Sequence, residues 1–454
     1  MKLEQAMRSN LWRTGLFLKG KSSFPLYHDM LRLQYGPLDE NLQIQRQKLK
    51  QILVHAWRHV PYYTPVLERA GVVQNGQVQL ENLRSVPLLT KKDIRENYDR
   101  LVSRDPARER RRPYVNTSGG STGEPVRFLQ DREYFRHMVS GKWMFHSFVE
   151  PFPYRYIKLW ASERDFFFGG TGLRRKLANW LQGQRLLNTF RMSDPDMLHY
   201  ISEINRYRPA VIEAYVQSIY ELALFIEKNR LEVFSPKGII TSAGVLYPKM
   251  KSLIEEVFRC RTYNRYGSRE VGDLACSCRY QTGLHLNVFL HHVEILNELL
   301  QPCRPGEAGE VYVTTLENFS MPLIRFRIGD VAVPSDTGAA CPCGRGLPLI
   351  ENLVGRATSM IRTRKGAVDC VAISTSLYFF NSLKRYQFVQ KAIDLIQMNV
   401  SVTDLEIWRQ DKVRIEEKLK KILGDDVAFE FNLVDEIPET PSGKYLYFIN
   451  EMAA

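Results

Sequence analysis

A loop of glycines and hydroxyl side chains is the first segment of this sequence that could do chemistry. Residues 117–123 read TSGGSTG, and they stand between two short apolar runs, at 114–115 and 126–129. Glycines let backbone amides approach an anion closely, and the hydroxyl groups donate further hydrogen bonds. This composition is typical of a phosphate-binding loop, although no Lys follows the last glycine as a Walker motif requires.

The same loop also matches the GxSxG pattern of a hydrolase nucleophile elbow. That elbow needs a strand that turns directly into a helix. Here Glu124 and Pro125 are followed by VRFL, which predicts a second strand instead. We therefore favour phosphate binding over hydrolysis.

Three other short motifs each present one polar residue that could serve a nucleotide. Glu270 ends the run YGSRE and could hold Mg²⁺, which prefers one or two carboxylates together with phosphate oxygens. Asp330 follows a basic strand and a glycine, where its carboxylate could accept hydrogen bonds from ribose hydroxyls. Lys444 lies in a loop framed by proline and glycine, as a mobile charge suited to phosphate and carboxylate oxygens. Taken singly, each motif is more typical of a solvated surface residue.

Cysteine spacing indicates a metal site. The chain has seven cysteines, too few for a disulfide scaffold, and four of them form two CxC pairs, at 276/278 and 341/343. On a strand, Cys276 and Cys278 point to the same face, so the pattern alone does not choose between them. The remaining three are expected to be single core or surface residues: Cys260, Cys303 and Cys370.

The elements that must position these residues change in character along the chain. The first 100 residues or so predict amphipathic helices, including one over 41–60, with Thr90 and Asp93 as a helix cap. From about 155, apolar strands alternate with helical patterns, which indicates a mostly parallel α/β sheet. Closely spaced strands over about 285–365 predict an antiparallel sheet or small barrel, and the last 95 or so residues a small α+β domain.

Composition and charge exclude several classes of protein. The 454 residues are 44% hydrophobic and 25% charged, which excludes a disordered, collagen-like or coiled-coil chain. No apolar run of about 18 residues and no secretory signal is present, so we expect a cytoplasmic protein. The net charge of +13 fits an anionic substrate, and no nucleic-acid-binding module is recognisable. The basic N-terminal segment, with Trp12 and Phe17 between its charges, leaves peripheral membrane association open.

Taken together, the order and spacing of these motifs resemble the adenylate-forming superfamily of acyl-CoA synthetases, luciferases and peptide-synthetase adenylation domains. The resemblance runs from about Leu83 to the C-terminus. Within the superfamily, the chain is most similar to the phenylacetate–CoA ligase-like group, which includes capsule-biosynthesis relatives. Three features carry that similarity: the doubled glycine in TSGGSTGEP, the form RYGSREVG, and the insertion CPCGRGLP ahead of Gly355 and Arg356.

The resemblance implies an α/β fold: a large N-terminal domain over 1–355, with mixed sheets, helices and a barrel-like part, and a small mobile α+β domain over 356–454. It also implies a reaction. A carboxylic acid and ATP, with Mg²⁺, form an acyl-adenylate and pyrophosphate, and the acyl group passes to CoA. The alternative acceptor is an amine, a sugar or a carrier protein in polysaccharide or specialised-metabolite biosynthesis. A non-catalytic scaffold is disfavoured by the intact Glu270, Asp330 and Lys444, and a homodimer stays open.

The resemblance assigns roles residue by residue. Lys444 would bridge the carboxylate and the α-phosphate, Glu270 would hold Mg²⁺, and Thr122 would act in the phosphate loop. The small domain would rotate about a hinge just after Arg356. The residues expected to bind the nucleotide are Ser118, Gly119, Gly120, Ser121, Thr122, Gly123, Ala243, Tyr266, Gly267, Ser268, Asp330 and Arg356.

A structural zinc ion is also implied by the resemblance. Its expected ligands are Cys278, His285, Cys341 and Cys343, a Cys₃His set that forms a closed tetrahedral site. Cys276 is the alternative to Cys278 as the first of these ligands. The ligand spacing typical of the phenylacetate–CoA ligase-like group favours Cys278.

The sequence departs from its relatives at several points. Gly244 stands where relatives commonly have Glu, residues 357–359 lack the usual acidic hinge residue, and Tyr445 follows the catalytic Lys. These departures lower the expectation of CoA ligation more than that of adenylation. For the acyl pocket, the sequence offers Trp143, Phe145, Tyr215 and the segment 243–245.

Overall fold

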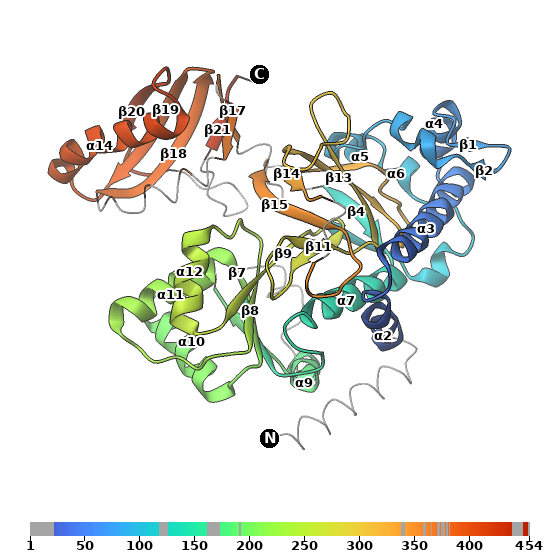
Figure 1. Ribbon diagram of the computed structural model, residues 1–454, viewed down its shortest axis with the longest axis horizontal. Coiled ribbons are helices and arrows are strands. Elements are labelled where there is room, and N and C mark those ends of the chain that lie inside the picture. The colour runs from blue at the N-terminus through green and yellow to red at the C-terminus, as the bar shows by residue number, and fades with distance from the viewer. Residues whose placement is uncertain are drawn as a thin grey trace.

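The fold was analysed in a computed structural model of the whole chain (Figure 1). It describes residues 22–117, 126–160, 173–189, 192–336, 341–356, 360–364, 366–369, 382–437 and 448–452, with Ile373, Leu377 and Phe380 between them. None of the helices in these segments is long and apolar enough to cross a membrane.

An eleven-stranded mixed sheet forms the centre of the molecule, in the order β12-β13-β14-β15-β11-β10-β9-β8-β7-β5-β6. Its strands are β5 (Tyr156–Trp160), β6 (Gln184–Asn188), β7 (Val211–Tyr215), β8 (Gly238–Ser242), β9 (Arg261–Ser268), β10 (Gly272–Ser277), β11 (Leu284–Leu286), β12 (His291–Leu296), β13 (Gly309–Thr315), β14 (Phe326–Pro334) and β15 (Leu349–Arg356). The α/β architecture expected from the sequence is confirmed.

The strands from β6 to β9 run parallel and are covered by helices on both faces. On β7, Ile212 and Ala214 belong to the core beneath one helical layer, whereas Val211 faces the other. Burial on both sides explains why these strands read as continuous apolar runs. The covering helices are α10 (Asp194–Tyr207), α11 (Val216–Asn229) and α12 (Pro248–Phe258) on the first face and α7 (Arg132–His146) on the second; α9 (Leu173–Gln182) packs beside β6.

From β9 to β12 the strands pair antiparallel and continue the same sheet. This is one of the two arrangements that the closely spaced strands after residue 285 predict. A separate hairpin of β3 (Tyr114–Thr117) and β4 (Arg127–Gln130) lies next to this part.

A helical N-terminal layer packs against the antiparallel strands. It contains α2 (Phe24–Leu33), α3 (Leu38–His59), α4 (Tyr63–Arg69), the short strands β1 (Val73–Gln74) and β2 (Gln77–Val78), α5 (Lys91–Glu96), α6 (Tyr98–Leu101) and the 3₁₀ turns Leu80–Ser85 and Arg108–Arg111. The expected helix cap is confirmed: the Thr90 side chain accepts from the Asp93 amide, and the Asp93 carboxylate accepts from the Thr90 amide at 2.8 Å.

Arg325 fastens this layer to the central sheet. Its side chain is 2% exposed and donates to the carbonyls of Arg84 and Val86, both at 2.6 Å, and to the Glu294 carboxylate at 3.0 Å. Next to it, Leu89 pairs alongside β14, with its amide on the Arg325 carbonyl at 3.0 Å. The chain therefore enters α5 at a fixed place on the sheet.

The C-terminal residues build a second sheet with its own apolar core, set apart in Figure 1. Its order is β20-β19-β18-β21, and one helix packs on it. The division of the chain near 355 stays a prediction. The elements after that point are β16 (Met360–Thr363), β17 (Gly366–Asp369), β18 (Leu383–Ala392), β19 (Leu395–Val402), α14 (Leu405–Leu423), β20 (Ala428–Leu433) and β21 (Phe448–Asn450).

We predict that Arg325→Met lowers the free energy of unfolding by about 3 kcal/mol, because it leaves Glu294 and two carbonyls without their buried partner. Arg327→Met, two residues further along the chain and within β14, is the matched control. Arg327 is 48% exposed and pairs with Glu310, so its loss should cost under about 1 kcal/mol. Chemical denaturation measures both, and equal losses for the two variants would contradict the prediction.

Candidate functional site

Hairpin β3–β4 holds both ends of the predicted phosphate loop. Thr117 and Arg127 are cross-strand partners, so the chain leaves and re-enters the hairpin at adjacent points. Strand β4 follows the loop, as the sequence predicts for a phosphate loop. A nucleophile elbow would have a helix at this position. The loop residues themselves, Ser118, Gly119, Gly120, Ser121, Thr122 and Gly123, lie outside the described residues.

Glu270 lies in the tight turn between β9 and β10. Ser268 and Gly272 pair across the turn, which leaves three residues to close it. A Cβ atom on Gly267 would lie 2.3 Å from the Gly272 carbonyl oxygen, so only glycine fits there. The Glu270 side chain is 7% exposed. The geometry therefore buries a carboxylate at the end of a strand.

Three elements hold this turn by its carbonyl groups. Gln130 of β4 donates its side-chain amide to the Glu270 carbonyl at 3.2 Å. Val271 accepts from the Tyr134 hydroxyl of α7 at 2.8 Å and from the His291 ring of β12 at 2.7 Å. Burial lowers the pKa of His291 to about 4, so this ring is neutral at pH 7.

Gln130 also connects the turn to the phosphate hairpin. Its side-chain oxygen accepts from Asn116 at 2.9 Å and from the Tyr114 hydroxyl at 3.2 Å. One buried amide thus joins the strand before the Gly/Ser/Thr loop to the backbone that carries Glu270. Two motifs about 150 residues apart in sequence lie at one place in the fold.

Lys91 is a site residue that the sequence analysis missed. Its ammonium nitrogen lies 3.3 Å from the Glu270 carboxylate, and its side chain is 26% exposed. It reaches this place because Leu89 pairs beside β14 and α5 begins directly afterwards. The capping motif predicted the helix, but nothing in the sequence showed which distant carboxylate its first lysine would meet.

Tyr266, Asp330 and Arg356 come together from three strands of the central sheet, although β9 is not adjacent to β14 or β15. The Tyr266 hydroxyl donates to the Asp330 carboxylate at 3.0 Å, and Asp330 and Arg356 are cross-strand partners on β14 and β15. The Tyr266 ring is 7% exposed and packs in the core against the antiparallel strands. The fold therefore gathers three of the residues expected to contact adenosine.

The carboxyl ends of the parallel strands carry two more of the predicted residues. Ala243 follows β8 and adopts the left-handed region, with a φ of 61°. An L residue there costs about 1–2 kcal/mol, and such strain is concentrated at functional sites. Tyr215 ends β7, and its ring centroid is 4.0 Å from that of Trp160 at the end of β5. Ligands of open α/β sheets bind at this edge of the sheet, outside the carboxyl ends of the parallel strands.

Trp143 and Phe145 are not at that edge. Trp143 stacks on Phe152 at 4.7 Å and on Phe24 at 4.8 Å, and Phe145 packs against Phe148. Both are buried core residues of α7, and their assignment to an acyl pocket stays a prediction. Lys444 lies outside the described residues, as do the hinge residues 357–359 and Tyr445.

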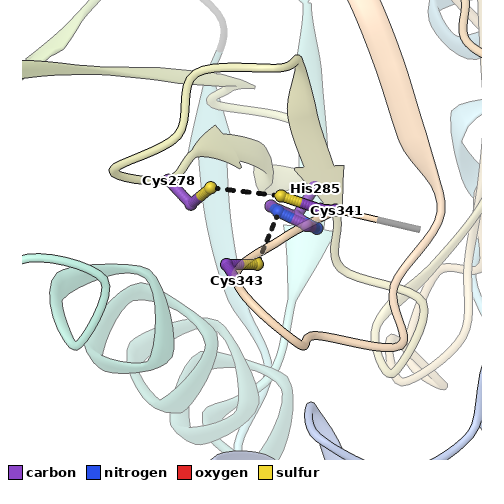
Figure 2. Close-up of side chains that lie close together, drawn as sticks. All are labelled: Cys278, His285, Cys341 and Cys343. Atoms are coloured by element: carbon purple, nitrogen blue, oxygen red, sulfur yellow. Dashed lines mark hydrogen bonds between the residues drawn. The ribbon is translucent and has the colours of Figure 1, made fainter. Parts of the chain in front are cut away.

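Cys278, His285, Cys341 and Cys343 form one compact cluster (Figure 2). Their ligand atoms all lie within 4.8 Å of one another. The Cys278 and Cys341 sulfurs are 3.5 Å apart, and Cys343 Sγ is 3.3 Å from His285 Nε2. Around zinc, with Zn–S bonds of about 2.3 Å, tetrahedral ligands are separated by roughly 3.5–3.8 Å, so the set fits this ion.

Three adjacent strands bring these residues together. Cys278 follows β10, His285 lies on β11, and Cys341 and Cys343 precede β15. Hydrogen bonds from Cys278, and then from His285 and Arg345, lower the pKa of Cys343. Thiolate is the form that binds metal.

Cys276 is outside this cluster. It sits within β10 and is fully buried, and its burial raises its pKa to about 12. Cys278 lies beyond the last residue of that strand, in a turn where its carbonyl accepts from the Gln281 amide. Strand alternation therefore does not apply to the pair, which is why the sequence pattern left the choice open.

Comparison with known proteins supplies relatives for this fold. A protein-family model described as the CapK C-terminal domain matches residues 360–451. The chain is 24% identical to Protein CapK of Staphylococcus aureus, over 96% of this chain and 95% of that protein. It is 26% identical to a phenylacetate–coenzyme A ligase of Thermus thermophilus, over 73% of this chain and 74% of that enzyme.

Among solved structures, the fold is similar to that of 2-hydroxyisobutyryl-CoA ligase in its postadenylation state. The TM-score is 0.71 at 19% sequence identity, and the match covers 93% of this chain and 92% of that one. These matches confirm the resemblance to the phenylacetate–CoA ligase-like group of the adenylate-forming superfamily that the motifs predict.

The structure describes residues from four of the predicted segments: Ala243, the run from Tyr266 to Glu270, Asp330 and Arg356. Ala243 and Glu270 follow β8 and β9 directly, whereas Tyr266 lies within β9 and Asp330 within β14. The sequence did not single out Gln130 and Lys91, which contact the Glu270 turn.

Proposed function

We propose that this chain is an ATP-dependent ligase that activates a carboxylic acid as an acyl-adenylate, with release of pyrophosphate. The observation that carries the proposal is the hydrogen-bonded connection through Gln130. It fixes the hairpin of the phosphate loop against the turn of Glu270, and Tyr266 on the strand before that turn donates to Asp330. These residues would provide the binding groups for the phosphates, the metal ion and the ribose.

The chemistry sets the task of these residues. A carboxylate that attacks an α-phosphate brings negative charge onto negative charge, so the protein has to position both groups and supply positive charge. Glu270 would hold Mg²⁺, which supplies part of that charge when bound. Lys91 supplies a cation of this chain's own beside Glu270, and Asp330 orients the ribose. Lys444 is proposed to bridge the carboxylate and the α-phosphate.

CoA is the acceptor that the phenylacetate–coenzyme A ligase relatives suggest. One observation favours the alternative, an amine, sugar or carrier-protein acceptor in polysaccharide assembly. Protein CapK matches 96% of this chain and the CapK C-terminal domain matches 360–451, whereas the phenylacetate ligases match only about three quarters. The small domain of such enzymes rotates to admit the acceptor. The similarity of residues 360–451 to the CapK domain is therefore relevant to the choice between CoA and the alternative acceptors.

We also propose that the Cys₃His cluster holds a structural zinc ion. Three sulfurs and one ring nitrogen fill a tetrahedral shell, so no place is left for a reacting water. The ion would clamp β10, β11 and the segment before β15, and so support the strands that carry Asp330 and the Glu270 turn.

The first experiment is carboxylate-dependent ATP–pyrophosphate exchange with a panel of aryl, fatty, hydroxy and amino acids. We expect exchange with one acid class and a fall of at least about 100-fold in Lys444→Ala, because a transition-state charge contact is lost. Full activity in that variant would contradict the proposed role of Lys444. Mass detection of an acyl-CoA, or of an acyl-amine or ester, then decides between the acceptors.

Lys91 provides a sharper test of the site. Lys91→Met removes the cation beside Glu270, and we expect the KM for ATP and for pyrophosphate to rise about tenfold or more. The control is Lys92→Met on the next residue, whose side chain is 74% exposed and pairs with Glu96. A purely structural Lys91 would lower the melting temperature and leave both KM values unchanged.

The metal content of the purified chain tests the zinc proposal. We expect about one zinc ion per chain by mass spectrometry and its loss in Cys278→Ser. Cys276→Ser is the matched control, two residues away and equally buried, and should keep the metal. Retention by the first variant and loss by the second would reverse the ligand assignment.

A further inference from the structure

The loop that carries two of the proposed zinc ligands packs directly on the N-terminal helical layer. Arg345 comes two residues after Cys343, and its Nε donates at 2.9 Å to the side-chain oxygen of Gln34, the residue directly after α2. Its side chain and its backbone amide also hydrogen-bond to the Cys343 sulfur. One arginine therefore contacts both a proposed metal ligand and a helix that lies outside the metal site.

The surroundings of Arg345 leave its charge unbalanced. Its guanidinium carbon lies 3.9 Å from the centre of the Phe148 ring and 5.0 Å from that of Tyr35. Its other contacts are with an amide and a thiol, so within the residues that the structure describes it contacts no carboxylate. The buried Phe148 ring also packs edge-on against His285, with the ring centres 5.8 Å apart. Phe148 therefore lies against both a proposed metal ligand and the arginine.

The charge of the proposed zinc centre explains a cation at this place. Zinc binds cysteine as thiolate, so Zn²⁺ with three thiolates and one neutral imidazole has a single net negative charge. Cys278, His285 and Cys341 are buried and Cys343 is half-buried, so water has little access to this charge. A buried charge without a partner is costly. The Arg345 guanidinium supplies the balancing charge at the most exposed of the four ligands.

The next residue, Gly346, fixes the same loop to the corner between α2 and α3. Its amide donates to the Gln34 carbonyl at 2.9 Å, and its carbonyl accepts from the Asn41 side chain of α3 at 2.7 Å. A Cβ atom on Gly346 would lie 1.9 Å from the Gly36 carbonyl oxygen, so only glycine lets the two backbones come this close. Gln34 and Asn41 are each 1% exposed. The corner and the loop therefore share a buried, hydrogen-bonded interface.

The helix that begins at this corner also supports the Glu270 turn. Gln45 of α3 donates to the His291 carbonyl at 2.7 Å, and the His291 ring contacts Val271, next to Glu270. Helix α3 is therefore held in its first turn by the loop of Cys343 and, one turn further on, by the strand whose histidine holds the Glu270 turn. The metal site and the Glu270 turn are thus connected to the same helix.

We propose that Arg345 is an outer residue of the zinc site, which balances the charge of the zinc centre and fastens the α2–α3 corner to it through Gln34. Metal binding then docks the N-terminal helical layer on the central sheet. The inference rests on the proposed zinc ion and goes beyond its four ligands. It makes both the metal affinity and the order of α2 depend on a residue that does not bind the metal.

Zinc affinity, measured by competition with a chromophoric chelator, tests the charge. We expect Arg345→Met to raise the dissociation constant of zinc about tenfold or more, which is the usual effect of losing an outer partner of a metal site. Arg345→Lys keeps the charge and should recover most of the affinity. Arg279→Met is the matched control, because Arg279 directly follows Cys278 but is exposed and donates to the Tyr280 hydroxyl at 2.9 Å.

Hydrogen exchange tests the docking. Removing zinc from the native chain with a chelator should raise exchange at least about tenfold in α2 and in the first turn of α3, because their buried contact with the loop loosens. Helix α11, which packs on the parallel strands, is the internal reference. Gln34→Met leaves Arg345 charged, so it should keep the zinc affinity. The rise on chelation should be smaller in this variant, because its corner is already released.

The possible results separate this inference from the zinc proposal. Equal zinc affinity in the native chain and Arg345→Met, or unchanged exchange in α2 after chelation, would overturn the inference and leave the zinc ion in place. An equal rise in α2 and α11 would mean that metal loss unfolds the whole chain, which also overturns a local docking role. A native chain that binds no zinc would overturn both.

Discussion

The buried carboxylate of Glu270 is the constraint around which this fold is organised. Removing such a charge from water costs several kcal/mol unless a partner compensates, and its turn must be rigid for the charge to stay in place. Gln130, Tyr134 and His291 bind the turn from three elements, and Lys91 supplies the compensating charge. The N-terminal layer is therefore part of the site, since Arg325 and Leu89 fix where Lys91 begins its helix.

The sequence predicted the elements better than their contacts. Strand–helix alternation, the Thr90 cap and the α/β class depend on local pattern, and the structure confirms them. The Lys91–Glu270 contact joins residues 179 positions apart, which no local pattern encodes. Local pattern also did not show what Trp143 and Phe145 pack against: Trp143 contacts Phe24 of α2, and Phe145 contacts Phe148.

Cysteine spacing was informative for a different reason. The two CxC pairs indicated a metal site from the sequence alone, and the family resemblance implied His285 and Cys278 as ligands together with Cys341 and Cys343, which the structure brings into one cluster. The choice between Cys276 and Cys278 depended on where β10 ends, and strand ends are the least predictable feature of a sequence. One residue beyond the strand was enough to bring the second thiol to the cluster.

Glu270 and Glu213 lie near opposite ends of one face of α7, and the cations around them give them different tasks. Glu270 has Lys91 at 3.3 Å, a single exchangeable cation that leaves room for a metal ion. Glu213 already contacts Lys142 and Arg265, so its charge is satisfied within the fold.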